Sequence, residues 1–233
     1  MKSQDVHSVR YAFLHFDGVI LENILTPITH AVVTKLGGKY TSEIEYNVFA
    51  RSQVHAAKFI KDTLRLKESV DEIIAYYYKE REEFEKSYTP KVNPGVLEFL
   101  SLLQNKGIQC ICYGGAPKEY FSKHIGSLSS FLGDSDYIQT KEFRPGVKEL
   151  AFDRFGLQPK EALFIDEAAL VGETCKQYGI PFIGISLPYH YSHQTAQMKL
   201  LGIKIIISSL VEINEAFFDT KLKCIDEETF WNY

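Results

Sequence analysis

The sequence contains no long apolar run. No stretch of its 233 residues approaches the roughly 20 uninterrupted apolar residues that a membrane-spanning helix needs. The first ten residues are polar and carry charges, so they cannot supply the apolar core of a secretory signal. These two observations predict a soluble protein, and the cytoplasm is its expected location.

Positive charge is also scarce. The chain has 26 Lys and Arg against 30 Asp and Glu, which gives a formal net charge of -4. Nucleic-acid binding normally requires a clustered basic face, and an anionic membrane surface requires a basic run. We therefore expect neither nucleic acid nor a membrane among the partners of this protein.

Cysteine is infrequent, and its spacing suits no common metal or redox motif. The chain has four cysteines. Cys110 and Cys112 lie two apart in a strand-like run, so their side chains point to the same face of a sheet. This is not the Cys-x-x-Cys spacing of a redox or zinc site. We expect buried, reduced thiols with a structural role.

The first third of the chain contains one strand and then only helices. Residues 11–16 read as a short buried strand that ends at the turn signal Asp17-Gly18. Thr26 and Pro27 are typical of a helix start, with Thr26 as the N-cap.

From there to about residue 88 the periodicity is helical, and it is clearest in an apolar stripe after residue 70. The charges at residues 79–83 are predicted to form the solvated face of that helix. The tyrosines at residues 76–78 could line a pocket, but packing in the core and at its rim is the prediction we favour.

After Asn93-Pro94-Gly95 helices and strands alternate. Asn93 is expected to cap a helix that ends at Gly107, and a strand at residues 108–113 follows. Further on, the sequence predicts a strand at residues 162–166, a helix at 171–179, a strand at 181–185, a helix at 196–201, a strand at 204–207 and a helix at 210–217. Such alternation indicates a parallel sheet with helices on both faces. Ligands of such sheets bind beyond the carboxyl ends of the strands, where Asp17, Gly114 and Asp166 are expected.

Several short motifs occur in a characteristic order. They are His15-Phe-Asp17-Gly-Val-Ile after the first strand, the segment from Gly107 to Gly115, Arg144-Pro145-Gly146, and Phe155-Gly-Leu-Gln-Pro-Lys-Glu-Ala-Leu-Phe-Ile-Asp166. Each motif alone is a weak signal, but their joint order and spacing are specific. In this order the sequence resembles the haloacid dehalogenase-like (HAD) superfamily, over nearly the whole chain.

The resemblance implies a fold with two parts. It implies an α/β core, a Rossmann-like doubly wound parallel sheet, from residues 1–21 and 93–233. It also implies an inserted α-helical cap at residues 22–92, as in relatives of phosphoglycolate phosphatase and β-phosphoglucomutase.

The family's chemistry depends on a small set of residues. Its first aspartate attacks phosphorus and forms a covalent aspartyl-phosphate, and a second aspartate acts as acid and base. A Ser or Thr and a Lys hold the phosphoryl oxygens, and the last carboxylates bind Mg²⁺. In this sequence His15 stands at the nucleophile position, while Asp17 retains the acid/base position.

The remaining positions are also partly altered. Gly114, followed by Gly115, replaces the phosphate-binding hydroxyl. Arg144 replaces the lysine with a planar fork in place of a compact ammonium. Asp166 retains the first metal-binding carboxylate. The second acid is either Glu167 or absent, because the alternative position is a leucine.

Three readings of His15 remain open at this point. It could accept a phosphoryl group, since histidine can form covalent phospho-intermediates. It could bind a metal with Asp166 and Glu167, in a site better suited to a transition ion than to Mg²⁺. It could also be a relic, because loss of a catalytic nucleophile in another hydrolase class costs on the order of 10⁶ in kcat.

The functional prediction is therefore a catalytically impaired phosphatase fold, a pseudophosphatase. It would bind a phosphorylated small molecule or a protein partner, and Mg²⁺ would bind weakly or not at all. The alternative is an active, atypical Mg²⁺-dependent phosphatase or hydrolase that acts on a small phosphorylated metabolite. Under either prediction His15, Asp17, Gly114, Arg144 and Asp166 should line one cleft at the carboxyl edge of the sheet.

Overall fold

The structure is a computed structural model, and it describes residues 7–128, 130–132 and 137–232. Its strands are β1 (Tyr11–His15), β2 (Gln109–Gly114), β3 (Tyr137–Gln139), β4 (Ala162–Asp166), β5 (Phe182–Ile185) and β6 (Ile206–Ile207). Its α-helices are α1 (Leu25–Lys35), α2 (Ser42–Val48), α3 (Gln53–Leu64), α4 (Val70–Ser87), α5 (Val96–Asn105), α6 (Lys118–His124), α7 (Ala169–Gln177), α8 (Gln194–Leu200) and α9 (Glu215–Asp226).

Four short helices complete the described elements. They are the 3₁₀ turns η1 (Gly126–Leu128), η4 (Pro159–Glu161) and η5 (Leu210–Glu212), and the π-helix η3 (Glu149–Arg154).

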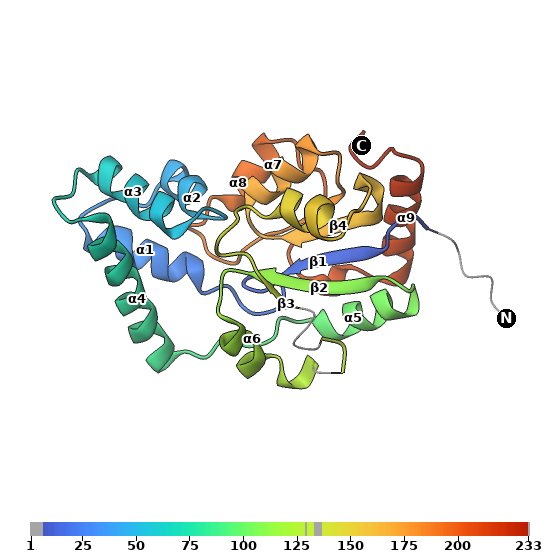
Figure 1. Cartoon of the computed structure of the whole chain (residues 1–233), viewed down its shortest axis with the longest axis horizontal. Coiled ribbons are helices and arrows are strands. Elements are labelled where there is room, and N and C mark those ends of the chain that lie inside the picture. Colours follow the sequence, from blue (N-terminus) through green and yellow to red (C-terminus); the bar gives the residue numbers. More distant parts are fainter. Residues whose placement is uncertain (1–6, 129, 133–136, 233) are drawn as a thin grey trace.

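The strands form one parallel sheet in the order β3-β2-β1-β4-β5-β6. β1 lies between β2 and β4, with Phe13 paired to Ile111 on one side and to Phe164 on the other. All carboxyl ends therefore meet at one edge, and this edge faces helices α1–α4 (Figure 1). The α/β Rossmann-like class predicted from the sequence is confirmed.

The two faces of the sheet bury separate apolar clusters because side chains alternate along each strand. On one face Ala12 and Leu14 pack with Phe99 of α5 and Phe218 of α9. On the other face Phe13 belongs to the cluster that contains α7 and α8. Strand β1 is thus covered by helices on both sides, and its end is held firmly in position.

Along the chain, helices α1–α4 follow β1 and precede α5. They pack together into a group of their own (Figure 1). We call residues 22–92 the helical segment. Its apolar side chains form two small clusters and no single core, one around Ile44, Ile60 and Ile73 and the other around Ile28 and Val32.

Two helix starts differ from the prediction. The first helix begins at Leu25, where the side chain of Asn23 accepts the backbone N–H of Thr26 at 2.9 Å, so Thr26 is not the N-cap. Asn93 is not a cap either, because Gly95 occupies that position in α5.

The Asn93 side-chain amide serves the connection between the two parts of the chain. It donates to the carbonyls of Val19 and Leu21 at 3.0 and 2.8 Å. An antiparallel bridge joins Leu21 to Val92 beside it. Asn93 therefore holds together the two segments that lead into and out of the helical segment.

The predicted helix at residues 210–217 is in fact two elements. Leu210–Glu212 is a 3₁₀ turn, and α9 begins at Glu215, where the side chain of Asn214 accepts the N–H of Phe217 at 2.9 Å. The cysteine prediction is confirmed in part: Cys110 and Cys112 pack against the same cluster and both are free thiols, but Cys112 is buried whereas Cys110 is only half-buried.

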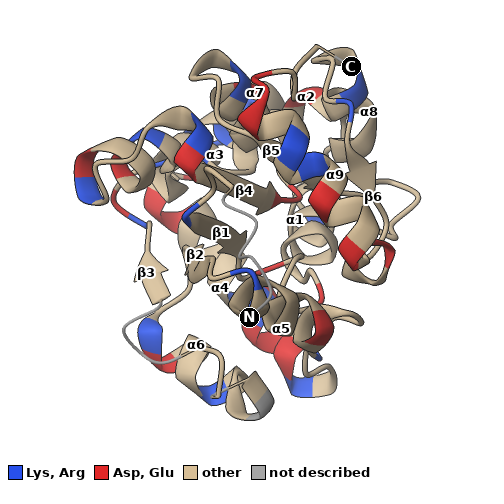
Figure 2. Cartoon of the chain, turned by 90° about the vertical axis from the view of Figure 1, so that its right-hand side faces the viewer, with Lys and Arg blue, Asp and Glu red and all other residues tan. Residues whose placement is uncertain are grey.

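On the side opposite α1–α4 the described residues carry charges of both signs. Lys and Arg are interspersed there with Asp and Glu (Figure 2). Within the described residues, no helix is both long and apolar enough to cross a bilayer.

Candidate functional site

The carboxyl edge of the sheet brings together residues that are far apart in the sequence. His15 ends β1, Asp166 ends β4, and Glu167 follows directly. His15, Asp166 and Glu167 are 6%, 1% and 0% exposed. Because β1 and β4 are neighbours in the parallel sheet, their terminal side chains meet below the helical segment.

The imidazole of His15 lies among oxygen atoms. Its Nδ1 is 2.8 Å from the Asp17 carbonyl oxygen, 2.9 Å from Glu167 Oε2 and 4.0 Å from Asp166 Oδ1. A carbonyl oxygen can only accept a hydrogen bond, so Nδ1 carries a proton and donates.

Two carboxylates stabilise the charged form of this ring. Burial alone would lower the pKa of His15, but the neighbouring Asp166 and Glu167 outweigh it and raise the pKa from 6.5 to about 10. Burial also raises the pKa of Glu167, to about 8, against the attraction of His15. The two acids therefore favour the charged imidazolium over the neutral ring, which is enclosed within the protein.

Asp166 is held by the protein through both of its oxygens. The hydroxyl of Tyr113 donates to Oδ2, and the backbone N–H of Ala168 donates to Oδ1 at 2.7 Å. Tyr113 lies on β2 and is completely buried. Sequence reasoning missed this tyrosine, which fixes the carboxylate beside His15.

The turn after β1 must be a glycine for Glu167 to reach the ring. Gly18 has φ +89°, which L side chains rarely adopt. A Cβ there would lie 2.9 Å from Cγ and Cδ of Glu167. The Asp17-Gly18 turn thus creates the space in which the Glu167 carboxyl contacts His15.

The turn after β2 is shaped by two further glycines. A Cβ on Gly115 would lie 2.0 Å from Nη2 of Arg144, so the guanidinium lies directly against the Gly115 backbone. A Cβ on Gly114 would lie 3.7 Å from His15 Nε2 and 3.2 Å from Cβ of Phe16. Arg144 therefore reaches the site, and Gly114 lies beside the His15 ring.

The atoms around His15 can be compared with the coordination that Mg²⁺ prefers. Mg²⁺ prefers oxygen ligands at about 2.0–2.1 Å in a near-octahedral arrangement. Here the protonated Nδ1 of His15 stands among the Asp17 carbonyl, Asp166 and Glu167, the oxygens to which such an ion would bind. This arrangement does not fit Mg²⁺.

A transition ion would meet a different set of ligands. His15, Asp166 and Glu167 offer ligand atoms that all lie within 4.8 Å of one another. One nitrogen and two oxygens are donors that such ions accept. Binding would nevertheless require Nδ1 to lose its proton and both of its hydrogen bonds.

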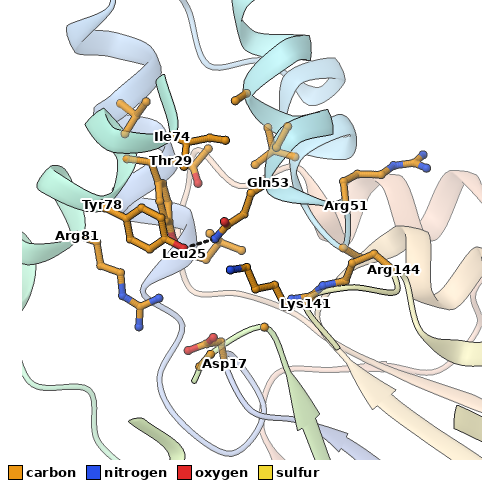
Figure 3. Close-up of a pocket in the computed structure, with 18 of the residues that line it drawn as sticks. Asp17, Leu25, Thr29, Arg51, Gln53, Ile74, Tyr78, Arg81, Lys141 and Arg144 are labelled. Carbon is orange, nitrogen blue, oxygen red and sulfur yellow. Dashed lines mark hydrogen bonds between the residues drawn. The ribbon is translucent and has the colours of Figure 1, made fainter. Parts of the chain in front are cut away.

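A cavity of about 540 Å³ opens above these residues, between the sheet edge and the helical segment. His15, Asp17, Asp166, Glu167, Gly115 and Arg144 line its floor, together with Lys141. Figure 3 shows the side chains of Lys141 and Arg144 directed toward the space above Asp17, and Arg81 extending toward Asp17 from α4. Arg81, Lys141 and Arg144 thus bring positive charge to this end of the cavity, beside the carboxylate of Asp17.

Arg81 corrects the prediction that residues 79–83 form only a solvated face. Its side chain is 18% exposed, its guanidinium lies 4.7 Å from the centre of the Tyr120 ring, and its Nε donates to Glu85 at 2.8 Å. A signal was present in the sequence, because Ile74, Tyr78 and Arg81 follow one another at helical spacing. Tyr77 and Tyr78, predicted to pack in the core and at its rim, also line the cavity.

Several buried polar atoms of the cavity wall lack a hydrogen-bond partner. Among the described residues these are Asp17 Oδ1, Glu167 Oε1, Thr29 Oγ1, Arg51 Nε and Tyr120 Oη. Buried polar groups are nearly always paired with protein or with water. These atoms therefore mark positions at which water or a polar ligand can bind.

Comparison with known proteins identifies the fold. No protein-family model matches the chain, and no curated protein matches it. Similar solved structures include a protein of Bacteroides vulgatus assigned as a beta-phosphoglucomutase, with 18% identity over 97% of this chain and 92% of that one, at a TM-score of 0.71. A HAD hydrolase of family IA, variant 3, from Entamoeba histolytica HM-1:IMSS has 14% identity over 92% and 100%, at 0.65.

A third similar structure contains phosphate. It is CbbY from Rhodobacter sphaeroides in complex with phosphate, with 14% identity over 91% of this chain and 99% of that one, at a TM-score of 0.61. The resemblance to the HAD superfamily is therefore confirmed at the level of the fold. The chain has the fold of HAD hydrolases and spans nearly the whole length of these structures.

Proposed function

We propose that this protein binds a phosphorylated ligand between the sheet edge and the helical segment, which acts as a cap, and that it does not turn the ligand over. The observation that carries the proposal is the pair of hydrogen bonds from Nδ1 of His15 to the Asp17 carbonyl and to Glu167. In the family, a nucleophile and a neighbouring divalent cation occupy this part of the site. Here the imidazolium of His15 takes the place of both.

Loss of turnover follows from the chemistry of the ring. Nδ1 is committed to hydrogen bonding, and a doubly protonated imidazole has no lone pair with which to attack phosphorus. Gly114 offers no hydroxyl to a phosphoryl oxygen. Asp17 could still move a proton, but it has no attacking carboxylate to work with.

Ligand binding remains chemically possible. Arg81, Lys141 and Arg144 supply positive charge around the floor of the cavity, and guanidinium groups bind phosphate through paired hydrogen bonds. The phosphate in the structure of CbbY supports a phosphate monoester as the ligand class.

An active enzyme is the second candidate function. It is favoured by Asp17, which lines the cavity and whose buried Oδ1 has no partner. In such an enzyme His15 would have to lose a proton, accept the phosphoryl group and then release it to water.

Replacement of His15 by Asp tests the proposal. His15→Asp restores a nucleophile and a metal ligand together, so it should bring Mg²⁺-dependent hydrolysis of an aryl phosphate from trace level to measurable turnover. Calorimetry should show Mg²⁺ binding weakly or not at all to the wild type and more tightly to His15→Asp. His15→Asn is the matched control, because it removes the imidazole without supplying a carboxylate, and it should remain inactive.

The outcomes separate the two functions. Steady turnover by the wild type that His15→Ala abolishes, with acid-labile, base-stable phosphate trapped on the protein, would establish His15 as a nucleophile and end the proposal. Sub-millimolar Mg²⁺ affinity of the wild type, abolished by Asp166→Asn, would also contradict it. Addition of Gly114→Ser to His15→Asp should raise turnover further only if Phe16 can shift, since the new Cβ would lie 3.2 Å from that side chain.

A further inference from the structure

The cavity has two ends of different chemistry. At the sheet edge lie Asp17, Lys141 and Arg144, and on the side of the helical segment lie Thr29 and Ile74 (Figure 3). Gln53 of α3 donates a hydrogen bond to the hydroxyl of Tyr78 of α4, and this contact bridges the cavity between the two ends. A ligand that fills the cavity must therefore be polar at one end and apolar at the other.

The apolar end lies inside the helical segment. We call it the apolar chamber. Its lining comes from α1, α3 and α4 and consists of Val32, Ala56, Ala57, Ile60, Ile73 and Ile74. Ala57, Ile60 and Ile73 belong to one apolar cluster of the segment and Val32 to the other. Both clusters also pack against Leu36, so the chamber is lined from two sides by side chains that belong to different clusters.

An unfilled chamber of this kind is unfavourable. Apolar walls without contacting atoms lose dispersion contacts, and side chains usually pack to fill such space. Water is a poor occupant of apolar walls that offer it few polar partners. The six wall residues of the chamber are apolar, and the polar groups beside them are the unpaired hydroxyl of Thr29 and the hydrogen-bonded pair of Gln53 and Tyr78.

We propose that the ligand is a single-chain amphiphile, a phosphate monoester whose alkyl or isoprenoid chain occupies the apolar chamber. The phosphate lies among Arg81, Lys141 and Arg144, and the chain passes the contact between Gln53 and Tyr78. The head-group position rests on the proposed function, whereas the position of the chain rests on the walls of the chamber alone.

The test is a chain-length series of alkyl phosphates. Inorganic phosphate and ethyl, butyl, hexyl, octyl and decyl phosphate are each titrated into the full-length protein by calorimetry, below the concentrations at which they form micelles. Each buried methylene should tighten the dissociation constant by about fourfold until the chamber is full. An affinity that is independent of chain length would overturn the proposal.

Matched variants on α3 locate the chain. Ala56→Trp fills the chamber and should remove the chain-length dependence while leaving the affinity for inorganic phosphate within about twofold. Val54→Trp is the control, because Val54 is 60% exposed on the same helix and does not line the cavity. If Ala56→Trp does not fold, Ile74→Gln makes the same wall polar and should reduce the gain in affinity per methylene. If affinity rises equally with chain length in the wild type and in a folded chamber variant, the alkyl chain does not bind in the apolar chamber.

Head-group variants keep this inference separate from the proposed function. Lys141→Met should weaken all phosphate esters by a similar factor without changing the gain per methylene. Octanol tests whether the alkyl chain alone is sufficient for binding, and octanoate tests whether a carboxylate can serve as the head group. If octanoate binds as tightly as octyl phosphate, the proposed phosphate head group is wrong. Hydrolysis of octyl phosphate by the wild type would refute the absence of turnover, while the chain-length series would still stand.

Discussion

The protonation of His15 is set by its surroundings. Its Nδ1 donates to the Asp17 carbonyl and to Glu167, while Asp166 lies 4.0 Å away. Together the two acids raise the pKa of His15 to about 10 although burial opposes it. An ion pair of this kind is destabilising to break, because removal of one partner leaves a buried charge uncompensated.

The stability of the protein should depend on pH through this cluster. The raised pKa of His15 means that the folded form holds its proton more tightly, so the stabilisation is complete below about pH 6.5 and is lost as the pH rises toward about 10. The raised pKa of Glu167 has the same effect, because the stabilisation from its proton is lost as the pH rises toward about 8. The unfolding free energy should therefore fall as the pH rises from 6.5 to 8.

Urea unfolding at several pH values measures this slope. His15→Asn removes one of the two protons and should make the decline shallower between pH 6.5 and 8. His55→Asn changes an exposed histidine on α3 and should leave the slope as in the wild type. Equal slopes for His15→Asn and the wild type would show that the ring of His15 does not hold its proton as described.

At the scale of the elements, the turns after β1 and β2 determine what the strands can present. Gly18 allows the Glu167 carboxyl to lie beneath its turn, and Gly115 allows Arg144 to lie against its backbone. The two glycines differ in one respect. Gly18 has a positive φ that disfavours any side chain, whereas only the contact with Arg144 constrains Gly115.

Gly18→Ala should therefore destabilise the protein and disturb the cluster. We expect a loss of about 1–3 kcal/mol for the left-handed backbone, increased by the contact with the buried Glu167 side chain. Gly37→Ala is the matched control, with φ +80° and no atom within 4 Å of the added Cβ. Thermal unfolding should show a larger loss for Gly18→Ala than for Gly37→Ala, and equal losses would mean that Glu167 is not confined by this turn.

At the scale of the whole molecule, the helical segment is tied to the sheet layer by buried polar contacts. Glu45 of α2 is 0% exposed and accepts from the hydroxyl of Ser192 at 2.9 Å and from the backbone N–H of His193. Gln197 of α8 donates to the carbonyl of Ser42 at 2.6 Å. The segment therefore closes over the cavity through specific hydrogen bonds on the α7–α8 side.

Removal of Glu45 should loosen this closure. Glu45→Ala leaves two partly buried donors without an acceptor, at a cost of about 1–3 kcal/mol, and should speed hydrogen exchange in α2 and in the loop before α8. Glu45→Gln keeps one acceptor and should be milder. Glu43→Ala, at an exposed position of the same helix, should leave exchange unchanged. Protection of α2 that persists in Glu45→Ala would show that apolar contacts alone hold the segment closed.

The local elements were largely predictable because they depend on local patterns. The run Ala162–Asp166 is predicted as a strand with the bounds that β4 has, since a continuous apolar stretch ending in a carboxylate leaves few alternatives. The order of the HAD-like motifs also indicated which strand ends would meet. Two errors concerned helix caps, at Thr26 and Asn93, because the choice of cap depends on contacts beyond the helix.

The sequence by itself determined the alternation of helices and strands, the α/β class and the substitutions at His15, Gly114 and Arg144. Only the tertiary structure decided what those substitutions do. The partners of His15 include Glu167, which lies 152 residues away along the chain and reaches it only because β1 and β4 are neighbours. In the same way Arg81 reaches the cavity only because α4 lies over the sheet edge. Such long-range contacts depend on the order of strands and the packing of layers, which no local periodicity encodes.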